Sequence, residues 1–409
     1  MDDSTTCVIV GAGPAGLVLG LLLARAGVEV TVLEKHADFL RDFRGDTVHP
    51  ATIGLLDDLG LFEHFDALPH SRIERVTVPD RAGRPSVMVD FGRLPVRHPY
   101  IAMVPQWDLL DLLAEEAARE PGFTLLREHE VTGVVRDGDR VVGVDLRSPS
   151  GGRRLLADLT VACDGRWSVV RRSAGLVARS FPVDFDVWWY RIPTRRAVGE
   201  SLLPRLRAGR VAIAIPREGY LQVARLGPKG TDRALRARGI EEFRAEAAEM
   251  LPEAADDVAA LAAMDDVKHL AVRLDRLTRW HSPGLLCIGD AAHAMSPVGG
   301  VGINLAVQDA VATARLLAGP LRRGVLGTSA GDRLLARVQR RRTVPTVVLQ
   351  TLQRILHARL IGPALAGRVS GPPPALVLLL RLVPALAALP ALLVGVGPRP
   401  ERAPAWARR

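Results

Sequence analysis

Apolar positions at the start of the chain follow first a strand-like and then a helix-like pattern. The run Thr6–Val10 predicts a buried strand, Pro14–Ala26 predicts an apolar helix, and Glu29–Leu33 predicts a second strand. Together they predict one β-α-β unit that ends on the acidic residue Glu34. Helical spacing of apolar residues predicts further helices at Pro50–Leu59, Gln106–Arg119 and Ile240–Met250.

Short apolar or alternating runs predict strands in the rest of the chain. Outside the middle of the sequence these runs are Arg72–Val78, Val87–Asp90, Val131–Val135, Val141–Leu146, Leu155–Ala162 and Leu285–Ile288. In the middle, the runs are extended and richer in large residues, at Val187–Tyr190, Val211–Ile215 and Tyr220–Ala224. We expect this middle block to form a separate β-rich lobe, joined by the strands of residues 72–90.

The C-terminal segment Ala375–Val396 is almost entirely apolar and contains one charged residue in 22. Such a run meets a loose criterion for a membrane span. However, Arg381, Pro384 and Pro390 divide it, and proline inside a helix costs about 3 kcal/mol. We therefore expect two short helices that pack on the body of the protein, on the partner subunit of a homodimer, or on a membrane surface.

Charge is unevenly distributed along the 409 residues. The formal net charge is +9, but residues 313–409 alone contain 16 arginines and 2 acidic residues. This excess has no interleaved aromatic platform and no nucleic-acid-binding motif, which argues against a nucleic-acid partner. The three cysteines are far apart and lie in apolar runs, no metal-ligand spacing is present, and no basic leader precedes Thr6. We expect reduced thiols, no metal and a cytoplasmic protein.

A glycine motif, Gly11-x-Gly13-x-x-Gly16, connects the first predicted strand to the first predicted helix. Glycines at these positions allow a tight turn and a close approach of the backbone to a pyrophosphate at the helix N-terminus. Glu34 follows Gly16 by 18 residues, close to the spacing of about 20 at which a carboxylate binds ribose hydroxyls. The unit therefore predicts a dinucleotide site, without deciding between NAD and FAD.

Two downstream motifs decide between these cofactors. The runs Cys163–Arg171 (CDGRWSVVR) and Gly289–His293 (GDAAH) each follow a predicted buried strand. Together with the N-terminal glycine motif, and in this order, they resemble the three signatures of the flavoprotein aromatic hydroxylases, the p-hydroxybenzoate hydroxylase-like family. The resemblance covers Thr6–Leu61, Val104–Gly175 and Gly284–Pro345, and it is faint between them.

The resemblance implies an FAD-binding role for residues at strand ends and helix starts. Gly11, Gly13 and Gly16 would hold the pyrophosphate and Glu34 the adenosine ribose, with Ala15, Lys35 and Val131 in the same set. Arg44 and Gln106 would contact the phosphates or the flavin chain, Asp164 both FAD and the nicotinamide cofactor, and Asp290 the ribityl hydroxyls. Residues near the isoalloxazine ring would be Pro297, Gly299, Gly300, Gly302 and Asn304.

The run Pro297–Asn304 supports this assignment on physical grounds as well. Its glycines leave backbone N–H groups unobstructed at the positive end of a helix, where an anionic reduced flavin would be stabilised. His293 belongs to the shared signature, and we interpret it as structural rather than as a base. No second glycine motif for NAD(P)H is present, which fits a family in which that cofactor docks transiently.

The expected fold is α/β: a Rossmann-like FAD-binding domain (residues 1–72, 100–178 and 268–330) with an inserted β-rich substrate domain (73–99 and 179–267). Residues 331–409 would form a helical, basic and apolar C-terminal region. The expected function is an FAD-dependent monooxygenase that uses NAD(P)H and O2 to hydroxylate a small aromatic molecule, phenolic or polyketide-like, through a C4a-hydroperoxyflavin. No catalytic side chain can be named from the sequence.

Alternatives share the FAD fold. Trp188–Pro193 resembles a broken form of the Trp-x-Trp-x-Ile-Pro motif of flavin-dependent halogenases, with Tyr190 in place of the second tryptophan and no halogenase-type lysine motif. A membrane-associated prenyl-lipid hydroxylase or reductase would suit the apolar tail, and a non-catalytic flavin-binding protein is a further alternative. Because successive strand residues face opposite ways, either Trp188 or Trp189 could line an aromatic pocket, with sheet packing as the other interpretation.

Overall fold

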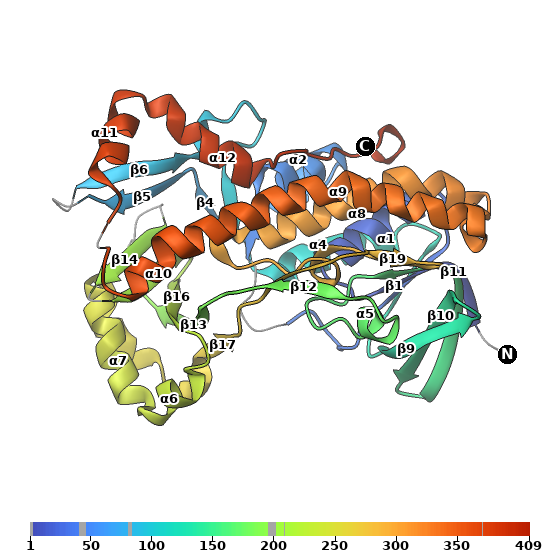
Figure 1. Cartoon of the computed structure of the whole chain (residues 1–409), viewed down its shortest axis with the longest axis horizontal. Helices are drawn as coiled ribbons and strands as arrows, with labels where there is room; N and C mark the ends of the chain where they lie inside the picture. Colours follow the sequence, from blue (N-terminus) through green and yellow to red (C-terminus); the bar gives the residue numbers. More distant parts are fainter. Residues whose placement is uncertain (1–2, 41–45, 81–83, 195–201, 208, 370) are drawn as a thin grey trace.

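A computed structural model of the chain describes residues 3–40, 46–80, 84–194, 202–207, 209–369 and 371–409. It contains two main sheets, with long helices running across the first (Figure 1). The first sheet has eight strands and a parallel core in the order β19-β20-β11-β1-β2-β8, with β10 and β9 added through β11. These strands are β1 (Asp3–Val10), β2 (Val30–Leu33), β8 (Phe123–Leu126), β9 (Glu130–Asp137), β10 (Arg140–Ser148), β11 (Gly151–Ala162), β19 (His281–Ser282) and β20 (Leu285–Cys287).

Helices cover the first sheet because their apolar faces pack on its buried strands. The largest core cluster joins β1, β2, β11 and β20 to α1 and α8, and every residue of β2 is buried. A parallel sheet that is covered in this way has near-continuous apolar strands, as the sequence pattern indicated. The helices are α1 (Pro14–Arg25), α2 (Pro50–Asp58), α3 (Phe62–Asp66), α4 (Gln106–Ala118), α5 (Val169–Ser173), α8 (Val301–Arg322) and α9 (Ser329–Leu356).

The second sheet is antiparallel, with strand order β14-β15-β16-β13-β17. Its strands are β13 (Phe185–Pro193), β14 (Leu203–Arg207), β15 (Arg210–Arg217), β16 (Tyr220–Pro228) and β17 (Lys268–Leu270). We call the face that contains Trp188, Tyr190 and Ile192 the back face; it packs on α7 (Gly239–Met250), next to α6 (Asp232–Ala237). We call the opposite face, which contains Val187, Trp189 and Arg191, the front face. The sheet therefore separates the two neighbouring tryptophans.

Short strands join the two sheets. The predicted strand Arg72–Val78 is confirmed except at Glu74, where it divides into β4 (Ser71–Ile73) and β5 (Arg75–Pro79). The chain breaks at Glu74 because the two halves pair with different partners, β4 with β7 (Ile101–Met103) and β5 with β6 (Pro85–Asp90). The remaining pairs are β3 (Thr47–Val48) with β7, and β12 (Ala178–Phe181) with β18 (Leu274–Leu277).

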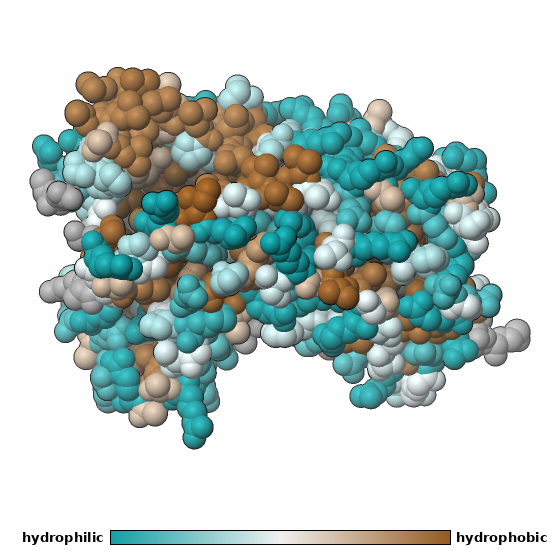
Figure 2. Space-filling model, viewed as in Figure 1, coloured by the Kyte–Doolittle hydropathy of each residue, from teal (hydrophilic) through white to brown (hydrophobic). Residues whose placement is uncertain are grey.

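The C-terminal segment forms two short helices, as predicted: α11 (Pro374–Leu382) and α12 (Ala388–Gly395). The break falls at Pro384, whereas Pro390 lies in the first turn of α12. A shorter helix, α10 (Gly362–Leu365), precedes them. Among the residues that the structure describes, no single helix is long and apolar enough to cross a membrane. Pro374–Leu382 and Pro384–Gly395 together have the length and composition of a membrane span, but the two parts are bent by 113° relative to each other. Only Val377 of α11 is buried, and the hydrophobic surface over this segment is visible at the upper left of Figure 2.

Candidate active site

The candidate site lies at the carboxyl ends of the parallel strands of the first sheet. Strands β1, β11 and β20 run parallel and adjacent, so the loops that follow them meet at one edge. A Cβ atom at Gly11 would lie 2.7 Å from the carbonyl oxygen of Cys163, and one at Gly289 would lie 3.5 Å from the Cβ of Ala15. The structure thus brings together the three motifs that the sequence places far apart.

Glycine stands at each position of the first motif for a different physical reason. Gly11 has φ +99°, a backbone conformation that favours glycine. A Cβ at Gly16 would lie 2.0 Å from the carbonyl oxygen of Gly11, so only glycine lets α1 start this close to β1. A Cβ at Gly13 would meet no atom within 4 Å. Gly11 and Gly16 are therefore required by the protein itself, whereas Gly13 leaves open space beside the N-terminus of α1, which fits a pyrophosphate.

Glu34 is held at the end of β2 by backbone donors. Its carboxylate accepts the Ala12 N–H (3.2 Å) and the His36 N–H (3.1 Å), and the residue is buried. This places an oriented carboxylate against the glycine loop, where the sequence predicts contact with a ribose. Lys35, the next residue, is exposed, and Val131 is buried in β9 opposite Leu146.

Asp164 and Asp290 follow β11 and β20 respectively. The Asp164 carboxylate accepts the Val170 N–H (3.1 Å) at the start of α5, and burial raises its pKa above the ordinary value. Asp290 is partly exposed and pairs with Arg166 of the neighbouring loop (3.2 Å). Asp290 therefore keeps surface for a further partner, whereas one oxygen of Asp164 already orders its own loop.

The glycine loop before α8 is fixed from both sides. Gly299 and Gly300 have φ +80° and +63°, and a Cβ at Gly300 would lie 2.8 Å from the Thr47 hydroxyl oxygen. His49 Nε2 lies 3.1 Å from the carbonyl oxygen of Gly300. Burial lowers the pKa of His49 to about 4, so the imidazole is neutral and donates to this carbonyl.

The rest of this loop is held by α8 and α9. The Thr52 hydroxyl donates to Asn304 Oδ1 (3.0 Å), and the Gln353 amide donates to the carbonyl oxygens of Ser296 and Val298 (2.8 Å each). Pro297 lies between these two anchored carbonyls. A Cβ at Gly302 would meet no atom within 4 Å, so the start of α8 is open on that side.

A buried ion network supports the loop after β20 and was not predicted from the sequence. Asp309 of α8 lies 2.5 Å from His293 and 2.8 Å from Arg342 of α9, and it also accepts the Gly289 N–H (3.1 Å). All three side chains are almost fully buried. His293 is therefore structural, as interpreted. The available signal was an acidic residue in the otherwise apolar run of α8.

The two sheets meet at a second set of polar side chains. Arg217 of β15 pairs with Asp46 (2.8 Å), and both side chains are nearly fully buried. Burial raises the pKa of Asp46, and the ion pair with Arg217 opposes this shift. The Gln106 N–H, at the start of α4, also donates to the Asp46 carboxylate. Arg44, the other predicted residue of this region, lies outside the described residues.

Comparison with known proteins agrees with this geometry. A family model described as an FAD binding domain matches residues 4–351. The chain belongs to this FAD-binding family. The flavoprotein is also similar to curated monooxygenases over most of its length.

Three similarities describe its place in the family. The flavoprotein is 34% identical to 6-methylpretetramide 4-monooxygenase of Streptomyces rimosus, over 90% of this chain and 86% of that protein. It is 28% identical to para-nitrophenol 4-monooxygenase of Pseudomonas sp. (strain WBC-3), over 79% and 80% of the two chains. The structure of anhydrotetracycline hydroxylase from Streptomyces rimosus superposes with a TM-score of 0.73 and 27% identity, covering 96% of this chain and 76% of that one. The protein is an FAD-dependent monooxygenase.

Proposed function

We propose that this monooxygenase uses NAD(P)H and O2 to hydroxylate a small aromatic molecule, phenolic or polyketide-like. The convergence of three loops on the glycine motif is the observation that carries the proposal, because it forms a dinucleotide site beside a second sheet. The names of the relatives support an aromatic substrate: they act on 6-methylpretetramide, para-nitrophenol and anhydrotetracycline. The halogenase and prenyl-lipid alternatives are not favoured by these names.

The proposed division of the chain is close to the division into two sheets, except that β17 at its boundary pairs in the second sheet. Residues 1–72, 100–178 and 268–330 would bind FAD, residues 73–99 and 179–267 would bind the substrate, and residues 331–409 would support both. The FAD pyrophosphate would lie at Gly13 and the start of α1, the adenosine ribose at Glu34, and the ribityl chain at Asp290 and Gln106. The ring would lie along Pro297, Gly300 and Gly302. Ala15, Lys35, Arg44, Val131, Asp164 and Asn304 complete the proposed set.

When bound, FAD supplies the redox chemistry: it takes electrons from the reductant and activates dioxygen. The protein's part is to bind, orient and exclude water. The N-terminus of α8 and the N–H groups around Gly302 would stabilise negative charge on the ring. His49 and Gln353 hold the carbonyl oxygens of this loop, which keeps those N–H groups in a fixed direction.

The test is reductant consumption under O2 by the FAD-loaded protein. We expect phenols or fused-ring phenols to stimulate NADH or NADPH oxidation, and the product to gain one oxygen atom that comes from ¹⁸O2. The apoprotein under the same conditions is the control. A protein that cannot be loaded with FAD would overturn the proposal, as would a reduced holoprotein that yields hydrogen peroxide and no oxygenated product with every aromatic tested.

A further inference from the structure

The front face of the second sheet changes from apolar to polar along its strands. Because opposed residues in an antiparallel pair share a face, the register defines rows across the sheet. The first row is apolar and buried. The middle row is apolar, with Trp189 and Ile213 partly exposed on either side of a buried Ala224, and the last row places the polar Arg191 and Gln222 beside the buried Ile215. In this order the rows are Val187–Leu226–Val211, Trp189–Ala224–Ile213 and Arg191–Gln222–Ile215.

Exposure of the middle row is unusual for its position. Val187, Leu226 and Val211 on one side are buried, in a cluster with Ile361 and Ala364 of the C-terminal segment. Gln222 and Ile215 on the other side are buried as well. Trp189 and Ile213 between them keep part of their surface exposed, although they pack against both neighbouring clusters. The partly exposed side chains in the middle of the face, Trp189 and Ile213, are therefore apolar, and they lie next to the partly exposed Arg191. We call Trp189 and Ile213 the apolar strip.

The surroundings of this strip connect it to the candidate active site. Trp189 and Val298 of the glycine loop both pack against the buried cluster that contains Val187 and Leu226. Trp189 also packs against a second cluster, which contains Met103 of β7 and Ala391 of α12. The indole N–H of Trp189 has no hydrogen-bond partner among the described residues. Trp280 also lacks one, but that residue is fully buried in the core against His293. Of these two tryptophans, Trp189 is the one that keeps part of its surface exposed.

The polar end of the face is cationic. The Arg191 guanidinium lies 5.6 Å from the ring centre of Trp107 and 5.1 Å from that of Tyr220. Arg217 in the adjacent row is held by Asp46 and Gln222. The Asp46 carboxylate acts electrostatically on both guanidinium groups. Burial lowers the pKa of both arginines because it removes water from around their guanidinium groups. An anionic oxygen could replace the hydrogen bonds to that water.

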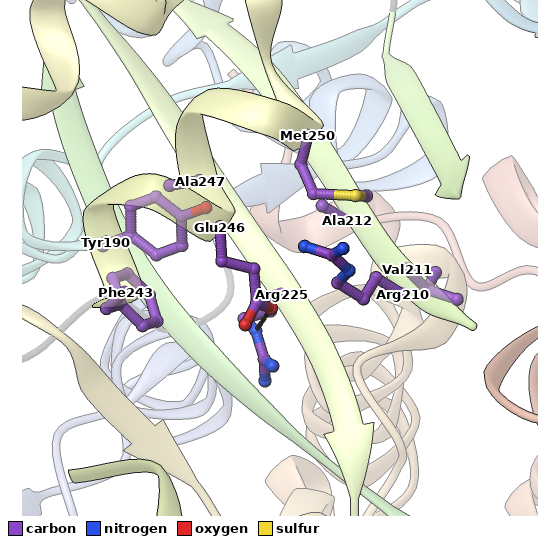
Figure 3. Close-up of a pocket in the computed structure, with 9 residues that line it drawn as sticks. All are labelled: Tyr190, Arg210, Val211, Ala212, Arg225, Phe243, Glu246, Ala247 and Met250. Carbon is purple, nitrogen blue, oxygen red and sulfur yellow. Dashed lines mark hydrogen bonds and ion pairs between the residues drawn. The ribbon is translucent and has the colours of Figure 1, made fainter. Parts of the chain in front are cut away.

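The back face offers no comparable surface. Figure 3 shows Tyr190, Phe243, Ala247 and Met250 facing one another between the sheet and α7. The cavity there measures about 10 Å³, room for no more than one water molecule. Trp188 is fully buried on this side and donates to Asp232 (2.8 Å).

We propose that the front face selects planar, fused-ring aromatic substrates that carry an anionic oxygen. The rings lie on Trp189 and Ile213, and the oxygen pairs with Arg191. Trp189 and Arg191 are two positions apart on one strand, about 6.5 Å by the usual rise, which is more than a single ring spans and close to the length of fused rings. This inference rests on the proposed function, and it names the substrate class of the same site.

Binding to the FAD-loaded enzyme tests the proposal with three probes: anthraquinone-2-carboxylate, its neutral carboxamide, and benzoate. Dissociation constants are measured from the change in flavin absorbance. We expect the wild-type enzyme to bind the carboxylate about tenfold more tightly than the carboxamide or benzoate, the size expected of a good charge-assisted hydrogen bond. Binding of neither anthraquinone, or equal binding of all three, would overturn the proposal.

Variants separate the two contacts. Trp189→Leu should weaken the binding of both anthraquinones about tenfold, because the contact between their rings and the Trp189 side chain is lost. Trp189→Phe should cause a smaller loss of affinity. Arg191→Met should remove the preference for carboxylate over carboxamide while keeping the carboxamide affinity. Trp188→Phe, the matched change on the back face, should leave all three constants within twofold. An unchanged affinity in Trp189→Leu, or an unchanged preference in Arg191→Met, would contradict the assignment.

The two proposals fail in different ways. FAD content and oxygen incorporation are measured on the same preparations. If the enzyme binds FAD and hydroxylates small phenols while Trp189→Leu and Arg191→Met behave as wild type, the monooxygenase function stands and this inference is wrong. If no FAD is bound, the proposed function fails first.

Discussion

The loops at the edge of the first sheet and the front face of the second sheet obtain specificity in different ways. In the loops, backbone approaches backbone so closely that a single methyl group would collide: 2.0 Å at Gly16 and 2.7 Å at Gly11. On the front face, the contacts are made by side chains, and Trp189 and Ile213 keep exposed surface. The proposed cofactor loops are therefore fixed by main-chain contacts, whereas the proposed substrate face can be altered by changing side chains.

The largest effect is expected from substitutions in the glycine loop that follows β1. Gly16→Ala should prevent formation of a soluble flavoprotein, since a Cβ there would lie 2.0 Å from the Gly11 carbonyl, well inside contact distance. Gly13→Ala is the matched variant: its Cβ meets no protein atom, so the apoprotein should keep its melting temperature within about 3 °C and lose FAD affinity at least about tenfold. Flavin absorbance and thermal unfolding measure both. A yellow, stable Gly16→Ala protein would contradict this account.

A smaller effect is expected at the ion network behind the loops. Asp309→Asn should destabilise the fold by up to about 3–5 kcal/mol, because Arg342 would keep its charge in a fully buried site with only the longer pair to Glu401 (3.8 Å) left. The control is Glu241→Gln on α7, where the Glu241–Arg244 pair is exposed and should contribute at most about 1 kcal/mol. Urea unfolding of both variants gives the difference. Equal losses would show that burial of the network has no energetic consequence.

The same contrast explains what the sequence could predict. The loops follow short, continuous patterns: an apolar strand, glycines at fixed spacing, and an acidic residue. Local backbone requirements at Gly11 and Gly16 produce these patterns, so the motifs could be found without any coordinates. The two proline-broken helices of the tail were predictable for the same reason, since proline acts on its own helix.

The front face could not be predicted because long-range packing defines it. Alternation in β13 places Trp188 and Trp189 on opposite sides, but only the docking of α7 decides that Trp188 is the covered one. The Asp46–Arg217 pair joins residues 171 positions apart, and the Asp309–Arg342 pair joins two helices across 33 positions. No local pattern connects such partners. Likewise, the single strand predicted over residues 72–78 is split because its halves pair with different strands.

The smallest expected effect concerns the pH dependence of the glycine loop. His49 has a pKa of about 4 when folded, against 6.5 for an exposed histidine, because burial disfavours its charged form. Between these values the unfolded chain binds a proton that the folded chain does not, so stability falls as the pH decreases from 6.5 to 4 and is fully present above 6.5. The contribution of this residue is at most about 3 kcal/mol.

His49→Gln isolates this contribution because glutamine can still donate to the Gly300 carbonyl but does not titrate. We expect the unfolding free energy of the variant to depend less on pH than that of the wild type between pH 6.5 and 4, with parallel curves above pH 7. As the pH is lowered, FAD should dissociate from the wild type at a higher pH than from the variant. The reason is that protonation of the buried His49 would disturb the glycine loop, which we propose lies along the flavin ring. Identical pH profiles for the two proteins would mean that the loop is not coupled to His49. The glycine loop would then be fixed by Gln353 and Thr47 alone, and the cofactor side would tolerate a side-chain change as readily as the front face.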